Sequence, residues 1–126
     1  MNFGLPKILR HESCWGLKLG HIGNTACEIW FCPPGYECKA HLHKNQVVNL
    51  RYIYGDAEFK IRKQGAWKTK YVTFWKDFFK KMVIGPEEAH SFINEKKWLI
   101  IFTRETYLNG YTPTSVSEDF QLYGGH

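Results

Sequence analysis

Short runs of alternating apolar and polar residues, each closed by a turn signal, constrain the fold of this chain more than any other feature. The clearest run is VVNLRYIY, residues 47–54, in which Val48, Leu50, Tyr52 and Tyr54 share one face. Apolar residues that recur at every second position indicate a half-buried strand, and helical periodicity is nearly absent from the chain. The sequence therefore predicts a protein built from strands.

The same signal recurs along most of the chain. Further strands are expected at residues 28–32, 57–62, 67–74, 80–84, 90–94 and 98–105. Glycine and proline mark the turns between them, and Gln64 with Gly65 predicts a tight hairpin. Many short strands separated by turn signals predict an all-β fold, an antiparallel β-barrel or jelly roll.

The length favours a single domain, since 126 residues with 44% hydrophobic content can fill one core. Within that domain, residues 28–106 are expected to form the barrel. Residues 1–27 are expected to add an arm or one or two strands. Residues 107–126 are polar and rich in turn residues, and they are interpreted as a C-terminal arm or loop.

Composition also indicates where such a chain works. No apolar run approaches the roughly 18 residues that a membrane span needs, and the N-terminus lacks a secretory apolar region. We therefore expect a cytoplasmic protein without a membrane partner. Its four cysteines are expected to be reduced thiols: Cys14, Cys27, Cys32 and Cys38.

The chain carries a net charge of +5, and much of the excess lies in residues 60–70 and 75–82. A basic stretch with interleaved aromatic residues is compatible with a nucleic-acid surface. Here, however, the charges alternate with apolar residues at period two, which favours the solvated face of a hairpin. Nucleic acid is not expected as a partner, whereas a small anionic or phosphorylated ligand fits the charge.

Three histidines form the candidate site. His41 and His43 are two residues apart in an extended run, so their side chains point to the same side. His90 opens a later strand, directly after a turn. A lone inward histidine is usually a satisfied core residue, but this arrangement favours a cluster that holds a divalent metal. Iron, zinc, nickel and manganese, and also no metal, remain as alternatives.

The cysteines near these histidines raise a second possibility, a structural zinc site, because Cys32 and Cys38 precede them in the pattern C-x5-C-x2-H-x-H. If residues 37–43 form one regular strand, Cys38 faces away from His41 and His43. The regular alternation therefore argues against thiol ligands, and a bulge in the strand would remove that argument.

These residues resemble the two conserved motifs of the cupins. From Gly35 the chain reads YECKA, His41-Leu42-His43, KNQV, Val48, NLRYIY and Gly55, and every spacing of the first motif fits. Val48 stands where that motif has a glutamate. Residues 85–94, GPEEAHSFIN, resemble the second motif with its proline and glycine displaced, and the resemblance covers residues 28–104.

The resemblance implies a single-domain cupin barrel, as a homodimer, with His41, His43 and His90 as metal ligands. The implied ligand pocket lies inside the barrel, and Tyr52 is a candidate catalytic acid–base group in it. The residues expected to line the pocket are Val48, Leu50, Tyr52, Phe59 and Phe92.

Three functions remain open on this basis. The first is a three-histidine metal site similar to that of non-haem iron dioxygenases, which would make the protein an oxidoreductase. The second is a metal-free isomerase or epimerase that acts on a nucleotide sugar with a histidine as its base. The third is a protein that binds or sequesters a small ligand without turnover. The sequence does not decide whether the chain is an enzyme.

Two other acidic positions bear on the missing glutamate. Glu87 and Glu88 precede His90 closely, but a solvated turn is the favoured interpretation for them. Arg104 and Glu105 stand at the end of the last strand, and the sequence does not assign their face.

Overall fold

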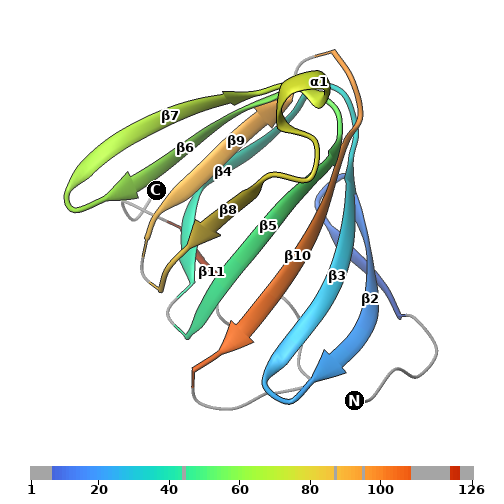
Figure 1. Cartoon of the computed structure of the whole chain (residues 1–126), viewed down its shortest axis with the longest axis vertical. Coiled ribbons are helices and arrows are strands. Elements are labelled where there is room, and N and C mark those ends of the chain that lie inside the picture. The colour runs from blue at the N-terminus through green and yellow to red at the C-terminus, as the bar shows by residue number, and fades with distance from the viewer. Residues whose placement is uncertain (1–6, 44, 87, 95, 109–119, 123–126) are drawn as a thin grey trace.

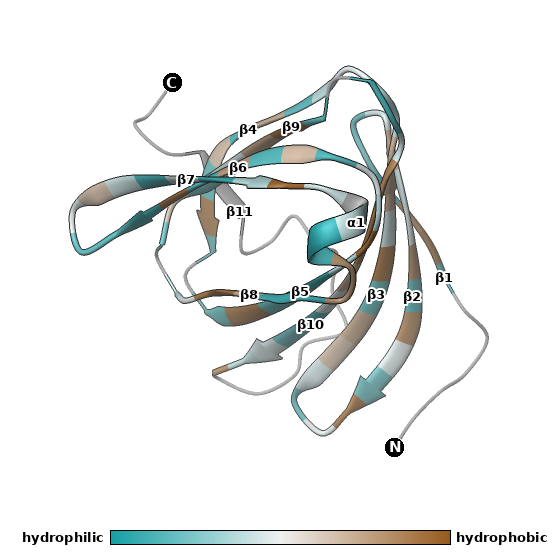
Figure 2. Cartoon of the chain, turned by 45° about the horizontal axis from the view of Figure 1, so that its top comes forward, coloured by the Kyte–Doolittle hydropathy of each residue, from teal (hydrophilic) through white to brown (hydrophobic). Residues whose placement is uncertain are grey.

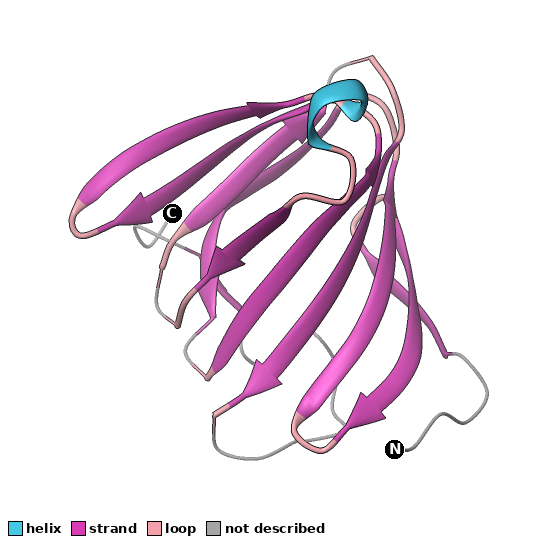
Figure 3. Ribbon diagram, viewed as in Figure 1, coloured by secondary structure: helices cyan, strands magenta, loops and turns pink. Residues whose placement is uncertain are grey.

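The structure is a computed structural model, and it describes residues 7–43, 45–86, 88–94, 96–108 and 120–122. Nearly every described element is a strand, as Figure 3 shows. In chain order the elements are β1 (Lys7–His11), β2 (Cys14–Ile22), β3 (Thr25–Cys32), β4 (Tyr36–His43), β5 (Gln46–Tyr54), β6 (Ala57–Lys63), β7 (Ala66–Val72), α1 (Phe74–Asp77), β8 (Lys81–Ile84), β9 (His90–Asn94), β10 (Leu99–Tyr107) and β11 (Phe120–Leu122).

The strands form two sheets. One has the order β1-β2-β3-β10-β5-β8 and the other the order β11-β4-β9-β6-β7, and every pairing is antiparallel. Figure 1 shows the two sheets face to face, fanning apart from the end where α1 lies. The expected all-β, antiparallel architecture is therefore confirmed.

The core lies between the sheets and follows the alternation seen in the sequence. On β5, Gln46, Val48, Leu50 and Tyr52 are buried while the residues between them are partly exposed. Apolar segments recur along the strands of both sheets in Figure 2. Because β10 and β5 are central in their sheet, side chains on their inner faces meet those of β4, β6 and β9 across the core.

Two glycines fix the turns that the sequence indicated. Gln64 and Gly65 both have positive φ, 53° and 79°, and they join β6 to β7 as the predicted two-residue hairpin. Gly55 has φ 103°, and a Cβ there would collide with the carbonyl oxygen of Trp98. Only glycine fits this close approach between the end of β5 and the segment before β10.

Asn94 ties the loop after β3 to the segment before β10. Its side chain is fully buried, and its Nδ2 donates hydrogen bonds to the carbonyl oxygens of Cys32, Pro33 and Lys97 at 3.3, 2.7 and 3.0 Å. Its own carbonyl oxygen accepts from the N–H of Gly35, at 2.7 Å. The asparagine of the second motif thus anchors the start of β4, which carries two of the histidines.

Some boundaries differ from the sequence-based expectations. The strand expected over residues 67–74 ends at Val72, and α1 follows in place of its last residue. The side chain of Asp77 accepts a hydrogen bond from the N–H of Thr73 at 2.9 Å, which stabilises the helical turn.

The two ends of the chain add strands to the sheets. Within residues 1–27, β1 and β2 form a hairpin that pairs with β3 of the same chain. The predicted C-terminal arm, 107–126, lies largely outside the described residues, and within it Phe120–Leu122 pairs with β4. No helix in the described part of the chain has the length and apolar content to span a membrane.

Candidate metal centre

A cavity of about 120 Å³ lies between the two sheets. Its wall is mostly apolar, and the three candidate histidines lie together on it. The cavity combines aliphatic and aromatic side chains with a few polar groups, as small-molecule sites commonly do. The sequence predicted a ligand pocket inside the barrel, and this cavity lies in the barrel interior.

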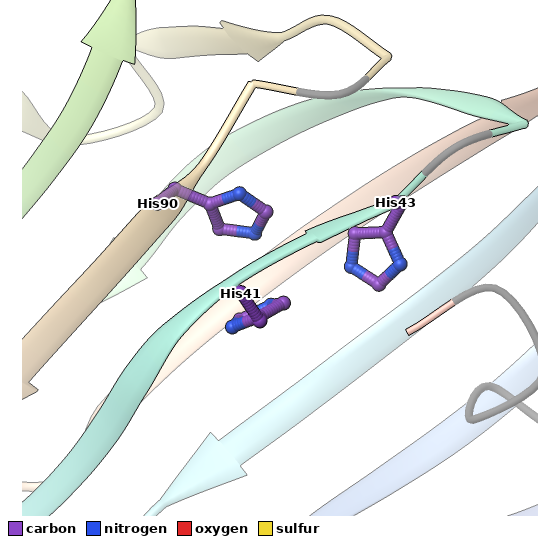
Figure 4. Close-up of side chains that lie close together, drawn as sticks. All are labelled: His41, His43 and His90. Carbon is purple, nitrogen blue, oxygen red and sulfur yellow. The ribbon is translucent and has the colours of Figure 1, made fainter. Parts of the chain in front are cut away.

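His41, His43 and His90 converge at this cavity. The first two project from β4 and the third from the start of β9, the neighbouring strand, where His41 and His90 are directly paired. One nitrogen of each ring lies within 4.8 Å of those of the other two. All three side chains are at most 8% exposed, and Figure 4 shows their rings grouped on one side of the two strands.

Backbone hydrogen bonds orient two of the rings. His41 Nδ1 lies 2.8 Å from the carbonyl oxygen of Lys39, and His90 Nδ1 lies 3.1 Å from that of Glu88. A carbonyl oxygen only accepts, so each Nδ1 carries the hydrogen and each Nε2 keeps its lone pair. Metal-binding histidines are usually oriented by hydrogen bonds of this kind.

The same two rings are uncharged at neutral pH. Burial lowers the pKa of His41 to about 3, and the nearby His90 contributes to the shift. Burial likewise lowers the pKa of His90 to about 4. Because a metal ion binds the neutral imidazole, protons do not compete for these two nitrogens near pH 7. The donor set therefore fits a divalent transition metal.

The position of Cys38 corrects the expectation that it faces away from the histidines. The pairing of β4 with β9 shifts register between Cys38 and His41, which marks a bulge. Cys38 is consequently buried on the cavity side, with its Sγ 3.6 Å from His41 Nδ1. Burial raises the pKa of the Cys38 thiol to about 12, so in the absence of a metal the thiol is neutral near pH 7.

The predicted pocket wall is largely where the sequence placed it. Val48 and Leu50 on β5, Phe59 on β6 and Phe92 on β9 all line the cavity. The rings of Phe59 and Phe92 stack with their centroids 5.1 Å apart. These four residues give the cavity its apolar side.

Tyr52 differs from its predicted place in the pocket. It is buried in the core outside the cavity lining, with its ring against Phe59 and its hydroxyl 3.6 Å from the sulfur of Met82. Burial also raises the pKa of its hydroxyl above the ordinary value. Tyr52 therefore packs the core, and its geometry does not support the predicted acid–base role.

The side chain of Glu88, two residues before His90, is held by groups outside the site. Glu88 forms an ion pair with Lys63 at 2.8 Å and accepts a hydrogen bond from the N–H of Gly85. Only its backbone carbonyl contacts a candidate ligand, through His90 Nδ1. Glu87 lies outside the described residues.

A carboxyl group that the sequence did not assign does line the cavity. Glu105 on β10 is 6% exposed and points inward, whereas Arg104 beside it is exposed. Glu28 on β3 lies next to it and is 2% exposed. The alternation Leu99, Ile101, Thr103, Glu105 is visible in the sequence, but Ile100 and Phe102 are apolar too. That strand therefore carries no clear signal of which face is inward.

No protein-family profile matches the chain, and neither does any curated protein. Solved structures do match. The capsular polysaccharide assembling protein CapF from Staphylococcus aureus aligns with a TM-score of 0.74 and 11% identity over 93% of this chain. A structure of Bacillus subtilis oxalate decarboxylase, a protein with Mn(II) centres, aligns with a TM-score of 0.73 and 17% identity over 97% of this chain.

In both cases the chain spans about a third of the matched protein, 34% of CapF and 32% of the decarboxylase. A conserved protein with a double-stranded β-helix domain from Klebsiella pneumoniae matches more fully. Its TM-score is 0.62 at 16% identity, over 90% of this chain and 89% of that one. At these identities the likeness establishes the fold alone, which is a double-stranded β-helix.

Proposed function

We propose that this chain, a cupin by its fold, binds a divalent transition metal through His41, His43 and His90. We further propose that it takes up a small organic ligand in the cavity beside the metal. The convergence of three buried imidazole nitrogens within 4.8 Å of one another carries the proposal. Two of these rings are already oriented by backbone carbonyls, so little reorganisation is needed on binding.

The proposed site has no carboxylate at position 48. Val48 lines the cavity near the imidazoles, in the place where the motif resemblance expects a glutamate. Three neutral ligands leave the full charge of the ion uncompensated, which favours a ligand that binds as an anion. When bound, a divalent metal supplies Lewis acidity, and iron would add redox chemistry with dioxygen, as an oxidoreductase needs.

The chain's own residues then bind and enclose the ligand. Leu50, Phe59 and Phe92 supply apolar surface and exclude water from the cavity. The basic hairpin and the net charge of +5 favour the approach of an anion. Small carboxylates, thiolates and enolised diketones are the anions that suit a cavity of this size.

Metal content tests this proposal directly. Elemental analysis of the purified, untagged protein is expected to find a near-stoichiometric transition metal. The metal is expected to be lost in the double variant His41→Ala/His43→Ala. His21→Ala, on β2 and outside the cluster, is the matched control and is expected to retain it. Wild-type protein that stays metal-free after anaerobic reconstitution with iron, zinc, nickel or manganese would contradict the proposal.

Turnover is tested separately, by oxygen uptake of the iron-loaded protein with small thiols and diketones. Uptake that depends on His90 would support a dioxygenase. Metal binding without turnover would instead support a protein that binds or sequesters its ligand.

The likeness to CapF, a protein of capsular polysaccharide assembly, favours one alternative, a metal-free cupin that binds a nucleotide sugar. A histidine would act as its base, but the lowered pKa values of His41 and His90 make both weak bases. A thermal shift with nucleotide sugars in metal-free protein, abolished in the double histidine variant, would favour this alternative. The homodimer and the cytoplasmic location stay predictions.

A further inference from the structure

Glu105 lies beside the position that lacks a carboxylate. In the pairing of β10 with β5, Glu105 stands directly opposite Val48, and both side chains line the cavity. Side chains of directly opposed residues are neighbours on one face of a sheet. A carboxyl group therefore enters the same cavity from the adjacent strand. It does not belong to the group of ligand atoms that lie within 4.8 Å of one another, which consists of the three imidazoles among the described residues.

Glu105 lies beside a second buried carboxyl group, that of Glu28. Trp30 Nε1 donates to Glu28 Oε1 at 2.9 Å, and Thr103 Oγ1 donates to Glu105 Oε1 at 3.3 Å. Two buried carboxyl groups that lie side by side do not readily ionise together, because like charges repel and burial disfavours both charged forms. The pair is thus a proton-holding unit whose cavity-facing member is Glu105.

The surroundings of the pair favour that proton. Burial raises the pKa of Glu105 well above its usual range, and the neighbouring Glu28 raises it further. Lys18, from β2, acts in the opposite direction, and the Cys27 thiol is the other titratable group close by on β3. Beyond them, the three imidazoles face Glu105 across the cavity, while β5 presents the uncharged Val48.

A second buried polar group lies on the neighbouring strand. Gln46 lies on the inner face of β5, two residues before Val48, and is 3% exposed. Its Oε1 is buried, and no hydrogen-bond partner for it occurs among the described residues. A buried acceptor of this kind is rare unless water or a ligand completes it. Gln46 thus adds an open acceptor on the inner face of β5, two residues from Val48.

We propose that Glu105, backed by Glu28, is the group that donates a hydrogen bond to an anionic oxygen of the ligand held at the imidazole cluster. The inference rests on the proposed metal site and adds the chemistry that site would select, a small carboxylate or enolate. A protonated carboxyl stabilises such an anion by an O–H···O⁻ bond, whereas an ionised one repels it.

Acetate binding to the cobalt-loaded protein tests this. Cobalt(II) reports anion binding through its visible absorption, so no turnover is needed. Acetate affinity in the wild type is expected to fall about tenfold per pH unit once the carboxyl pair loses its proton. Glu105→Gln keeps a neutral donor, so its affinity is expected to stay within about threefold of the wild-type value near neutral pH and to lose the alkaline fall.

The partner residue separates this role from a purely structural one. In Glu28→Gln the like charge is gone, so Glu105 ionises more easily and the fall in affinity is expected to move to lower pH. Glu105→Gln and Glu28→Gln each remove one buried carboxyl group, but the first is expected to abolish the alkaline fall in acetate affinity and the second to move it to lower pH. Glu37→Gln, on the exposed face of β4, is the matched control and is expected to behave as the wild type.

An alkaline fall that survives unchanged in both variants would overturn the inference, because the titrating group would then lie elsewhere. Failure of cobalt to bind the histidines would instead overturn the proposed metal site. In that case infrared spectra of the metal-free protein still test whether the carboxyl pair holds a proton. The C=O stretch of a protonated carboxyl is expected near neutral pH in the wild type and is expected to be lost in Glu105→Gln. Its absence from the wild type would show that Glu105 does not hold a proton.

Discussion

At the scale of single residues, backbone carbonyl groups decide which ring nitrogen of His41 and His90 is available to a metal. His41 and His90 each use Nδ1 on a carbonyl two residues earlier in the chain, so both present Nε2. The same scale separates Tyr52 from the site. Its hydroxyl donates to the weak acceptor of Met82, and its ring packs in the core against Phe59.

A substitution at Tyr52 tests this assignment. Tyr52→Phe removes one weak O–H···S contact and leaves the packing of the ring intact. We expect the free energy of unfolding to change by less than about 1 kcal/mol, with unchanged metal content. Denaturant unfolding and elemental analysis provide the measurements. Loss of the metal, or a tenfold fall in any oxygen uptake, would return Tyr52 to the site.

At the scale of elements, the site depends on how β4 and β9 are held together. His41 pairs with His90 at one end of this ladder, and Asn94 closes the other end through three carbonyl groups. The strands thus fix the relative placement of the imidazoles before any metal arrives. Such preorganisation lowers the cost of binding.

Asn94→Ala is expected to be among the more destabilising single substitutions on β9. It leaves three buried or partly buried carbonyl oxygens without their donor, at a cost of about 3 kcal/mol in the free energy of unfolding. Urea unfolding measures the difference, with Asn24→Ala in an exposed turn as the control. A change as small as that of the control would show that other groups satisfy these carbonyls.

At the scale of the whole molecule, the two sheets enclose a cavity with imidazoles on one side and the carboxyl group of Glu105, which has Glu28 beside it, on the other. Removing both carboxyl groups from water makes the folded protein sensitive to alkali. A group whose pKa is raised by folding stabilises the native state below its unfolded pKa. That stabilisation is lost as pH rises through the folded value.

The pH dependence of unfolding checks this. In the unfolded chain Glu105 loses its proton near about pH 4.3, whereas in the folded chain it retains the proton to higher pH. Between the unfolded and the folded pKa of Glu105, the wild type is expected to lose stability relative to Glu105→Gln by up to about 1.4 kcal/mol for each pH unit. The comparison uses metal-free protein throughout. A stability difference that does not change with pH would contradict the raised pKa.

Much of this architecture was predictable from the sequence. Period-two alternation identified β5 and β6, and the spacing of His41 and His43 predicted that their side chains share one face. The faces of Cys38 and Glu105 could not be predicted. A bulge inverts the parity of β4 after Cys38 without any change in composition. On β10 both faces are apolar, so a buried glutamate has no sequence signal of its own.

The bulge in β4 has a consequence for variation in chain length. Between Cys38 and His41 the strand holds one residue more than its partner β9 needs, since Cys38 pairs with Phe92 and His41 with His90. Deleting Ala40 would restore a regular ladder and leave both histidines on the inner face. The hydrogen bond from His41 to Lys39, which spans the bulge, would be lost. Elsewhere in a strand, a one-residue deletion turns every following side chain to the opposite face. At this position both histidines would still face inward after the deletion.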